Sequence, residues 1–148
     1  MITVAEVMTA DLYTLEPHDT LEDAKQLMIE QRIRHLPIVN DSGDLVGLVT
    51  MSDVLAASDS TLREPIDRAD PACITLADVM ITDIVSVDEH ASLRQCARFL
   101  EEHKIGCLPV VNHGKLQGII TDTDFVSVAI NLIEQMEQLD AMELDDEF

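Results

Sequence analysis

The chain contains no tryptophan, and aromatic residues make up only 3% of its 148 residues. Its core must therefore be built from aliphatic side chains and methionine, which are plentiful, since 47% of the residues are hydrophobic. Basic residues are also scarce: nine Lys and Arg stand against 29 Asp and Glu, giving a net charge of −20. Phosphate contacts need clustered Lys and Arg, so we expect no nucleic acid and no anionic membrane among the partners. Solubility or a saline cytoplasm explains this charge better than one specific cationic partner does.

The sequence has few cysteines and no long apolar run. Cys73, Cys96 and Cys107 show no CxxC spacing, and an odd number of cysteines is typical of reduced thiols. The N-terminus has neither the basic region nor the apolar stretch of an export signal. No run reaches the roughly 20 apolar residues that a transmembrane helix needs. These absences predict a cytoplasmic protein without membrane insertion.

Catalytic and metal-binding motifs are missing as well. There is no nucleophile elbow, no P-loop and no cluster of His and Cys at metal-ligand spacing. The histidines are scattered, and His18 and His90, which occupy similar places before predicted helices, are interpreted as loop residues. Cys107 is interpreted as a packing residue rather than a reactive thiol. We therefore expect no catalytic activity and no metal site.

What the sequence does contain is an internal repeat. Residues 4–21 (VAEVMTADLYTLEPHDTL) align with residues 76–93 (LADVMITDIVSVDEHASL), and IRHLPIVN aligns with IGCLPVVN, both at an offset of 72. GLVTMSD and GIITDTD align at an offset of 71, because one residue is missing from the turn that precedes the second phrase. We divide the chain into repeat 1 (1–57), a linker with two prolines (58–75), repeat 2 (76–129), and a C-terminal helix with an acidic tail (130–148).

The sequence of each repeat predicts secondary-structure elements in the order strand, helix, strand, strand, helix. The first strands are expected at 12–15 and 84–87. Thr20 and Ser92 are expected to cap the helices that follow, with Asp23 and Gln95 three residues further on. A second helix is expected to begin near the Asp that ends each repeated phrase. The fold class is therefore α+β, with two repeats packed together through their sheets.

Residues 125–144 predict a long final helix. Its apolar face is traced by Val126, Ala129, Ile130, Ile133, Met136 and Leu139 or Asp140. This face either covers the protein's own core or mediates self-association, and the sequence favours neither. From residue 134 to the end there are seven acids and no base, which predicts a solvated and partly disordered tail.

The repeated phrase Gly-x-x-Thr-x-x-Asp combines groups that suit a ligand. A glycine allows a ligand or another backbone to approach, an aspartate accepts two hydrogen bonds from a ribose diol, and a helix start offers free N–H groups to an anion. The same Thr and Asp also fit a simple helix cap. The chemistry alone leaves both interpretations open.

The two units resemble cystathionine-β-synthase (CBS) domains, and the pair resembles a Bateman module. The matching pieces are VMT and VMI, HLPIVN and CLPVVN, and the two Gly-x-x-Thr-x-x-Asp phrases, which together cover about residues 1–130. The resemblance implies a compact pseudo-twofold module that forms a homodimer. It also implies binding of AMP, ADP, ATP or S-adenosylmethionine in clefts between the repeats.

In the family, Thr and Asp of one repeat hold the ribose, and segments of the other repeat hold the adenine. The resemblance therefore implies two ligand sites that combine residues from both repeats. One site comprises Thr121, Thr123 and Asp124 with Thr9, Tyr13, Ile33, Arg34 and His35. The other comprises Thr50, Ser52 and Asp53 with Ile81, Val85, Ile105, Gly106 and Cys107.

The two sites differ in charge. Arg34 and His35 can face a phosphate, whereas Gly106 and Cys107 at the equivalent positions cannot. We expect the Asp124 site to prefer a charged nucleotide, with Mg²⁺ or moderate salt reducing its repulsion by the acidic protein. The predicted function is a regulatory sensor that signals to a separate effector protein. The alternative is a ligand-free dimerisation or scaffold module.

Overall fold

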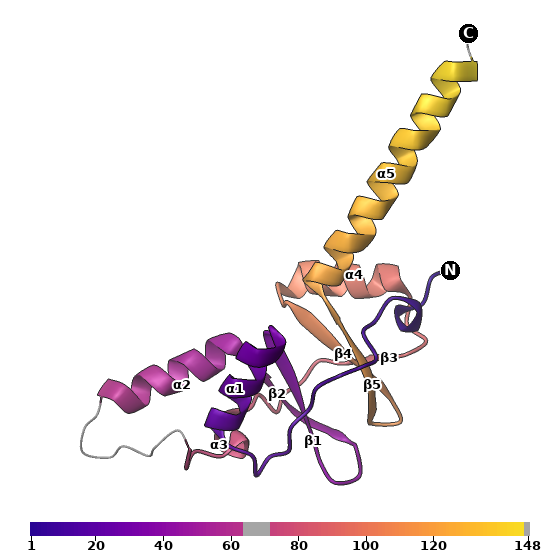
Figure 1. Ribbon diagram of the computed structural model, residues 1–148. Helices are drawn as coiled ribbons and strands as arrows, with labels where there is room; N and C mark the ends of the chain where they lie inside the picture. Colours follow the sequence, from indigo (N-terminus) through magenta and orange to yellow (C-terminus); the bar gives the residue numbers. More distant parts are fainter. Residues whose placement is uncertain (64–71, 147–148) are drawn as a thin grey trace.

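A computed structural model describes residues 1–63 and 72–146 and shows an α+β fold of two similar halves (Figure 1). The first half contains α1 (Leu21–Gln31), β1 (His35–Val39), β2 (Leu45–Thr50) and α2 (Met51–Arg63). The second half contains β3 (Val87–Asp88), α4 (Leu93–His103), β4 (Cys107–Asn112), β5 (Lys115–Thr121) and α5 (Asp122–Asp146). Two short helices, η1 (Val4–Glu6) and α3 (Leu76–Val79), precede the respective halves. The α+β class and the repeat are thus confirmed.

The first strand of each repeat is shorter than predicted. Of the strand expected at 12–15, only Leu15 pairs, in a single parallel bridge to β1. Of the strand expected at 84–87, only Val87 is in a strand, the two-residue β3, which pairs in parallel with β4. The N–H of Glu89 continues that ladder by donating to the carbonyl of Val111 at 3.2 Å. The equivalent residue in the first half is Pro17, which has no N–H to donate, so the ladder cannot extend there.

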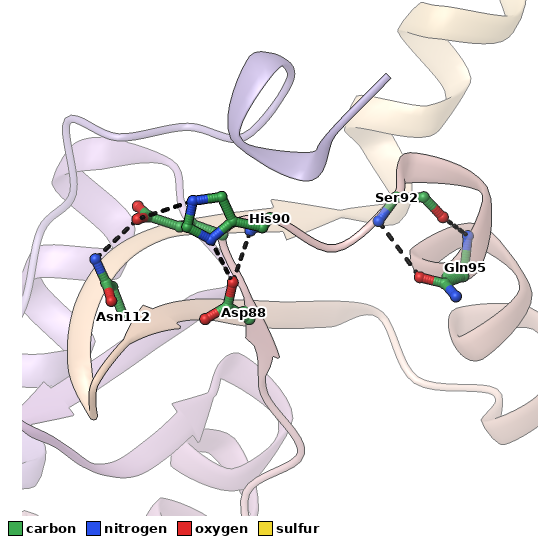
Figure 2. A network of polar contacts seen from close by, with 6 residues as sticks. Asp88, His90, Ser92, Gln95 and Asn112 are labelled. Carbon is green, nitrogen blue, oxygen red and sulfur yellow. Dashed lines mark hydrogen bonds and ion pairs between the residues drawn. The ribbon is translucent and has the colours of Figure 1, made fainter. Parts of the chain in front are cut away.

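Both predicted helix caps are present. The Thr20 hydroxyl accepts from the N–H of Asp23 at 3.1 Å, and the Asp23 carboxylate accepts from the N–H of Thr20 at 3.0 Å. Ser92 and Gln95 exchange the corresponding bonds at 3.1 and 3.4 Å (Figure 2). These reciprocal bonds satisfy N–H groups that the first turn of a helix leaves without partners.

The loop before α4 is held by a polar network at the end of the three-stranded sheet formed by β3, β4 and β5 (Figure 2). The ring Nδ1 of His90 lies 2.8 Å from Asp88 Oδ1, and Asn112 donates to Glu89 Oε1 at 2.8 Å. The bond from the backbone N–H of His90, together with its ring, lowers the pKa of Asp88. His18 in the first half lies 3.3 Å from the carboxylate of Glu16. Both histidines are therefore exposed loop residues, as predicted.

The two halves exchange their first segments. Val4 of η1 packs in the core of the second half, and Leu76 of α3 packs in the core of the first half. Backbone bonds accompany each exchange: the N–H of Val4 donates to Ala91 at 2.8 Å, and the N–H of Leu21 donates to Ile74 at 2.9 Å. Each half thus needs a segment of the other to complete its core.

The two glycines of the repeated phrases make room for methionine side chains from the other repeat. A Cβ at Gly47 would lie 2.9 Å from Cγ of Met80, and a Cβ at Gly118 would lie 2.9 Å from Cγ of Met8. At Gly118 it would also lie 2.8 Å from the backbone oxygen of Thr9. The close approach predicted for these glycines is therefore made by the protein itself.

The additional backbone contact at Gly118 predicts that alanine is more destabilising there than at Gly47. Gly118→Ala is expected to destabilise the protein by about 2–3 kcal/mol, because the backbone at Thr9 cannot yield as a side chain can. Gly47→Ala, whose nearest contacts all belong to the side chain of Met80, should destabilise by about 1 kcal/mol. Urea denaturation of both variants measures the difference, and equal losses would contradict the stated contacts.

Helix α5 stands away from the rest of the molecule (Figure 1). The large apolar residues of its predicted face are 50–63% exposed, so the proposal that this face covers the protein's own core is wrong. The predicted disorder of the acidic end is also wrong as far as Asp146, because the helix continues to that residue. Residues 147–148 lie outside the described part. Helix α2 continues to Arg63, and the remainder of the predicted linker up to residue 71 is likewise outside it.

No helix within the described residues is long and apolar enough to cross a lipid bilayer.

Candidate functional site

A cleft of about 940 Å³ lies between the two halves. Its walls come from the segment before α1, from the loop between α1 and β1, and from the strand-to-helix junctions β2–α2 and β5–α5. Ligand pockets in proteins commonly measure about 300–1,000 Å³, so the cleft is large enough for a nucleotide.

All eight residues of the first predicted site line this cleft. They come from three separate segments of the chain: Thr9 and Tyr13; Ile33, Arg34 and His35; and Thr121, Thr123 and Asp124. The structure thus places in one cleft the segments of the two repeats that the resemblance assigned to a single site. Their role in binding a ligand stays a prediction.

Residues of the second predicted site are divided. Thr50, Ser52 and Gly106 line the same cleft as the first site. The other five do not line it: Asp53, Ile81, Val85, Ile105 and Cys107. The junction β2–α2 therefore faces the same cleft as the junction β5–α5, rather than contributing only to a separate one.

Backbone pairing explains why Thr9 reaches the second half. Thr9 forms an antiparallel bridge with Ile119 of β5, with N···O distances of 2.9 and 3.0 Å. Ile81 forms the equivalent bridge with Leu48 of β2, at 2.8 and 3.0 Å. The segment before the first strand of each repeat is therefore hydrogen-bonded to a strand of the other repeat, which is where the resemblance places it.

Thr121 and Asp124 form a reciprocal helix cap. The Thr121 backbone N–H and hydroxyl both donate to Asp124 Oδ2, at 2.9 and 3.2 Å, and the N–H of Asp124 donates to the Thr121 hydroxyl at 3.4 Å. Thr50 and Asp53 repeat the arrangement at 2.8–3.2 Å. Among the hydrogen bonds between described residues, none involves Asp124 Oδ1. The cap and a ligand contact can therefore coexist on one carboxylate.

His35 faces the opposite half across the cleft. Its Nε2 lies 3.2 Å from the position that a Cβ of Gly106 would take, so glycine there makes room for the ring. Burial lowers the pKa of the His35 imidazole; the carboxylate of Asp122 raises it, and the guanidinium of Arg34 lowers it further. The lowered pKa favours the neutral ring in the free protein, and it will respond to a new charge in the cleft.

Sequence reasoning missed several residues of the cleft. Arg32, the left-handed C-cap of α1 with φ 56°, adds a second guanidinium to the walls. Asp122 begins α5 inside the repeated phrase, and its carboxylate accepts from the N–H of Thr123 at 2.8 Å. Both adjoin predicted site residues, and this proximity was the only signal. The others that were missed are Asp11, Leu12, Pro37, Met51, Leu55, Ile119 and Val126.

Cys107 is a packing residue, as the sequence suggested. It is 6% exposed, and burial, with a smaller effect of Asp122, raises the pKa of its thiol to about 12. A thiol with so high a pKa is protonated at neutral pH and is a poor nucleophile.

Comparison with known proteins decides the family. A model of the CBS domain matches residues 4–60 and again residues 76–131. The chain belongs to the CBS domain family. The interpretation of the repeat as a tandem CBS pair is therefore confirmed.

Solved structures share this CBS-pair fold over nearly their whole length. A Vibrio cholerae protein with a proposed role in acetoin utilization is 45% identical, with a TM-score of 0.81 over 93% of this chain and 97% of that one. CBSX2, a protein of Arabidopsis thaliana, has been solved in complex with AMP. That structure is 32% identical, with a TM-score of 0.77 over 89% of this CBS pair and 98% of CBSX2.

Curated relatives differ in how much of their length the CBS pair accounts for. Hypoxic response protein 1 of Mycobacterium tuberculosis is 31% identical over 84% of this chain and 82% of its own length. Homoserine O-acetyltransferase of Methanohalophilus mahii is 33% identical over 87% of this chain. The chain spans only 24% of that enzyme's length.

Proposed function

We propose that this CBS pair is a regulatory module that binds an adenosine-containing ligand in the cleft between its halves. The observation that carries the proposal is the convergence of the eight predicted residues, drawn from three segments and both repeats, on one cleft of nucleotide size. The AMP complex of the similar protein CBSX2 supports the ligand class. We propose a regulatory rather than a catalytic role.

The charges of the cleft suggest how a nucleotide is oriented. Asp124 has one carboxylate oxygen outside its cap and suits the ribose diol. Arg32 and Arg34 lie in the loop after α1, and His35 begins β1 directly after it; a phosphate beside these residues gains charge-assisted hydrogen bonds. This orientation favours AMP, ADP or ATP at the Asp124 site, with Mg²⁺ accompanying the more highly charged nucleotides.

The Asp53 site is proposed to take a less charged adenosyl ligand such as S-adenosylmethionine. Its wall residues Thr50, Ser52 and Gly106 carry no charge, and they share the cleft with the first site. A ligand at one site therefore lies near the other, and the two affect each other's affinity through the common wall.

The exposed apolar residues at the start of α5 fit the proposed homodimer. Val126, Ile130 and Ile133 are each at least half exposed and lie on one face at helical spacing. No ionisable residue occurs between 125 and 133, so a second copy meets no like charge there. A separate effector protein is proposed to detect the ligand-dependent state.

A ligand-free scaffold is the second candidate function. It is favoured by the reciprocal caps, because Thr and Asp of both repeated phrases already have partners within the protein. In that case the cleft is a by-product of packing two repeats, and dimerisation is the whole activity.

A thermal-shift screen separates the two functions. Nucleotide-free protein is heated with AMP, ADP, ATP or S-adenosylmethionine, each with and without Mg²⁺. A ligand at about 100 times its Kd is expected to stabilise the protein by about 2.7 kcal/mol. A clear rise in Tm with one ligand supports the sensor, and the absence of a shift with every ligand would favour the scaffold.

The phosphate contact predicts a pH dependence that His35 carries. Because a phosphate raises the lowered pKa of the imidazole, binding takes up a proton, and affinity for AMP should rise as the pH falls from about 7.5 to about 6. His35→Gln removes this proton uptake, whereas the titration of the AMP phosphate is common to both proteins. Calorimetric titrations across this pH range measure the ratio of the AMP affinities of the wild type and His35→Gln. A ratio that does not change with pH would contradict a phosphate at His35.

A further inference from the structure

The C-terminal half of α5 carries an exposed apolar patch that the proposed function does not use. Leu132, Met136, Leu139 and Met142 are 54–65% exposed, and their spacings of four, three and three residues place them along one side of the helix. Nothing in the described residues covers them, and the helix projects away from the other elements of the molecule (Figure 1). We call these four residues the methionine patch.

Acidic residues continue the rows of the methionine patch. Asp140 follows Met136 by four residues and Glu143 follows Leu139 by four, so each is a direct neighbour on the helix surface. From residue 122 to the end of the chain there are nine acids and no base. The charged residues beside the apolar patch are therefore all acidic.

This arrangement separates the two halves of α5 by the partner that each can accept. The uncharged stretch 125–133 around Ile130 can meet a second copy of itself. Pairing the methionine patch with another methionine patch would place acids against acids, which disfavours association. Methionine side chains adapt to differently shaped apolar partners, which suits recognition of another protein.

We propose that the methionine patch docks a basic amphipathic helix of a partner protein. The partner presents apolar residues at helical spacing to the patch, with Lys or Arg placed to meet Asp140 and Glu143. The general acidity of the protein indicates no particular partner, whereas acids placed beside an exposed apolar stripe do. The inference extends the effector of the proposed function, but it requires no ligand in the cleft.

The test uses a synthetic peptide of roughly 18 residues with Leu at helical spacing and Lys elsewhere, and a control peptide with Glu in place of Lys. Fluorescence anisotropy at near-physiological salt should show binding of the Lys peptide only. Met136→Ser with Leu139→Ser should weaken binding about 100-fold. Ile130→Ser with Ile133→Ser is the matched control, and it should leave peptide affinity unchanged while weakening self-association.

A second pair of variants controls for non-specific attraction to an acidic protein. Asp140→Asn with Glu143→Gln should weaken peptide binding about fivefold. Glu101→Gln with Glu102→Gln changes the net charge equally on α4 and should have no effect. Equal losses in the two variants would mean that net charge alone attracts the peptide, and would overturn the proposal.

Methyl NMR spectra locate the contact directly. With ¹³C-labelled methionine methyl groups, the signals of Met136 and Met142 should shift on adding the peptide, while buried Met28 should not. Unchanged Met136 and Met142 signals, or loss of the dimer in Met136→Ser with Leu139→Ser, would overturn the proposal. AMP binding measured on the same variants should stay intact, so a failure here is distinguishable from a failure of the proposed cleft function.

Discussion

Asp124→Ala is expected to weaken AMP binding about 100-fold, because two charge-assisted hydrogen bonds to the ribose are lost. The same substitution removes a helix cap and should lower the free energy of unfolding by only about 1 kcal/mol. Asp53→Ala is the matched control. Asp53 makes the same cap with Thr50 but does not line the cleft.

The two variants should therefore lose similar stability but differ in affinity for AMP. Denaturation with urea gives the first quantity, and isothermal titration calorimetry gives the second. If both variants bind AMP as the wild type does, the carboxylate of Asp124 is only a cap and the scaffold function is favoured. If both lose binding equally, the loss follows from destabilisation or from a site at Asp53, and the assignment of the ribose to Asp124 is wrong.

Leu76→Ala is expected to destabilise the protein by about 2–5 kcal/mol. Leu76 belongs to the second repeat by sequence, yet its side chain is 0% exposed in the core of the first half. Replacing it with alanine leaves a cavity in the core of the first half, although Leu76 belongs to the other repeat. Because each half needs the other, the protein should still unfold in a single transition.

Ile29→Ala provides the comparison for that experiment. Ile29 lies on α1 of the same half but is 60% exposed, so its loss should change stability by no more than about 0.5 kcal/mol. Urea denaturation followed by circular dichroism measures both variants. A loss below 1 kcal/mol for Leu76→Ala, at about the level of a surface substitution, would contradict the exchange of segments between the halves.

The local features of the fold could be predicted because they depend on neighbouring residues. Thr20 with Asp23, and Ser92 with Gln95, are caps whose donors and acceptors lie three residues apart. The repeat itself is visible by aligning the chain with itself. In contrast, the first strand of repeat 1 ends early because Pro17 has no N–H, whereas the equivalent Glu89 continues the ladder in repeat 2. Which N–H continues the ladder is known only once the strands have been paired.

Features set by contacts between repeats were harder to predict. The spacing of the repeated phrase could not show that Met8 and Met80, rather than a ligand, occupy the space beside Gly118 and Gly47. Nor could it show that Thr50 lines the same cleft as Thr121. The resemblance to a known family supplied the pairing of segments for the first site. For α5, helical periodicity identified the apolar residues but could not say whether another element covers them.

A crystal structure of the protein co-crystallised with AMP would test most directly the central claim that AMP binds in the cleft. The account predicts one AMP in the cleft, with its ribose hydroxyls hydrogen-bonded to Asp124 and its phosphate beside Arg34 and His35. AMP bound elsewhere on the protein, or density for the ribose that lies away from Asp124, would contradict it.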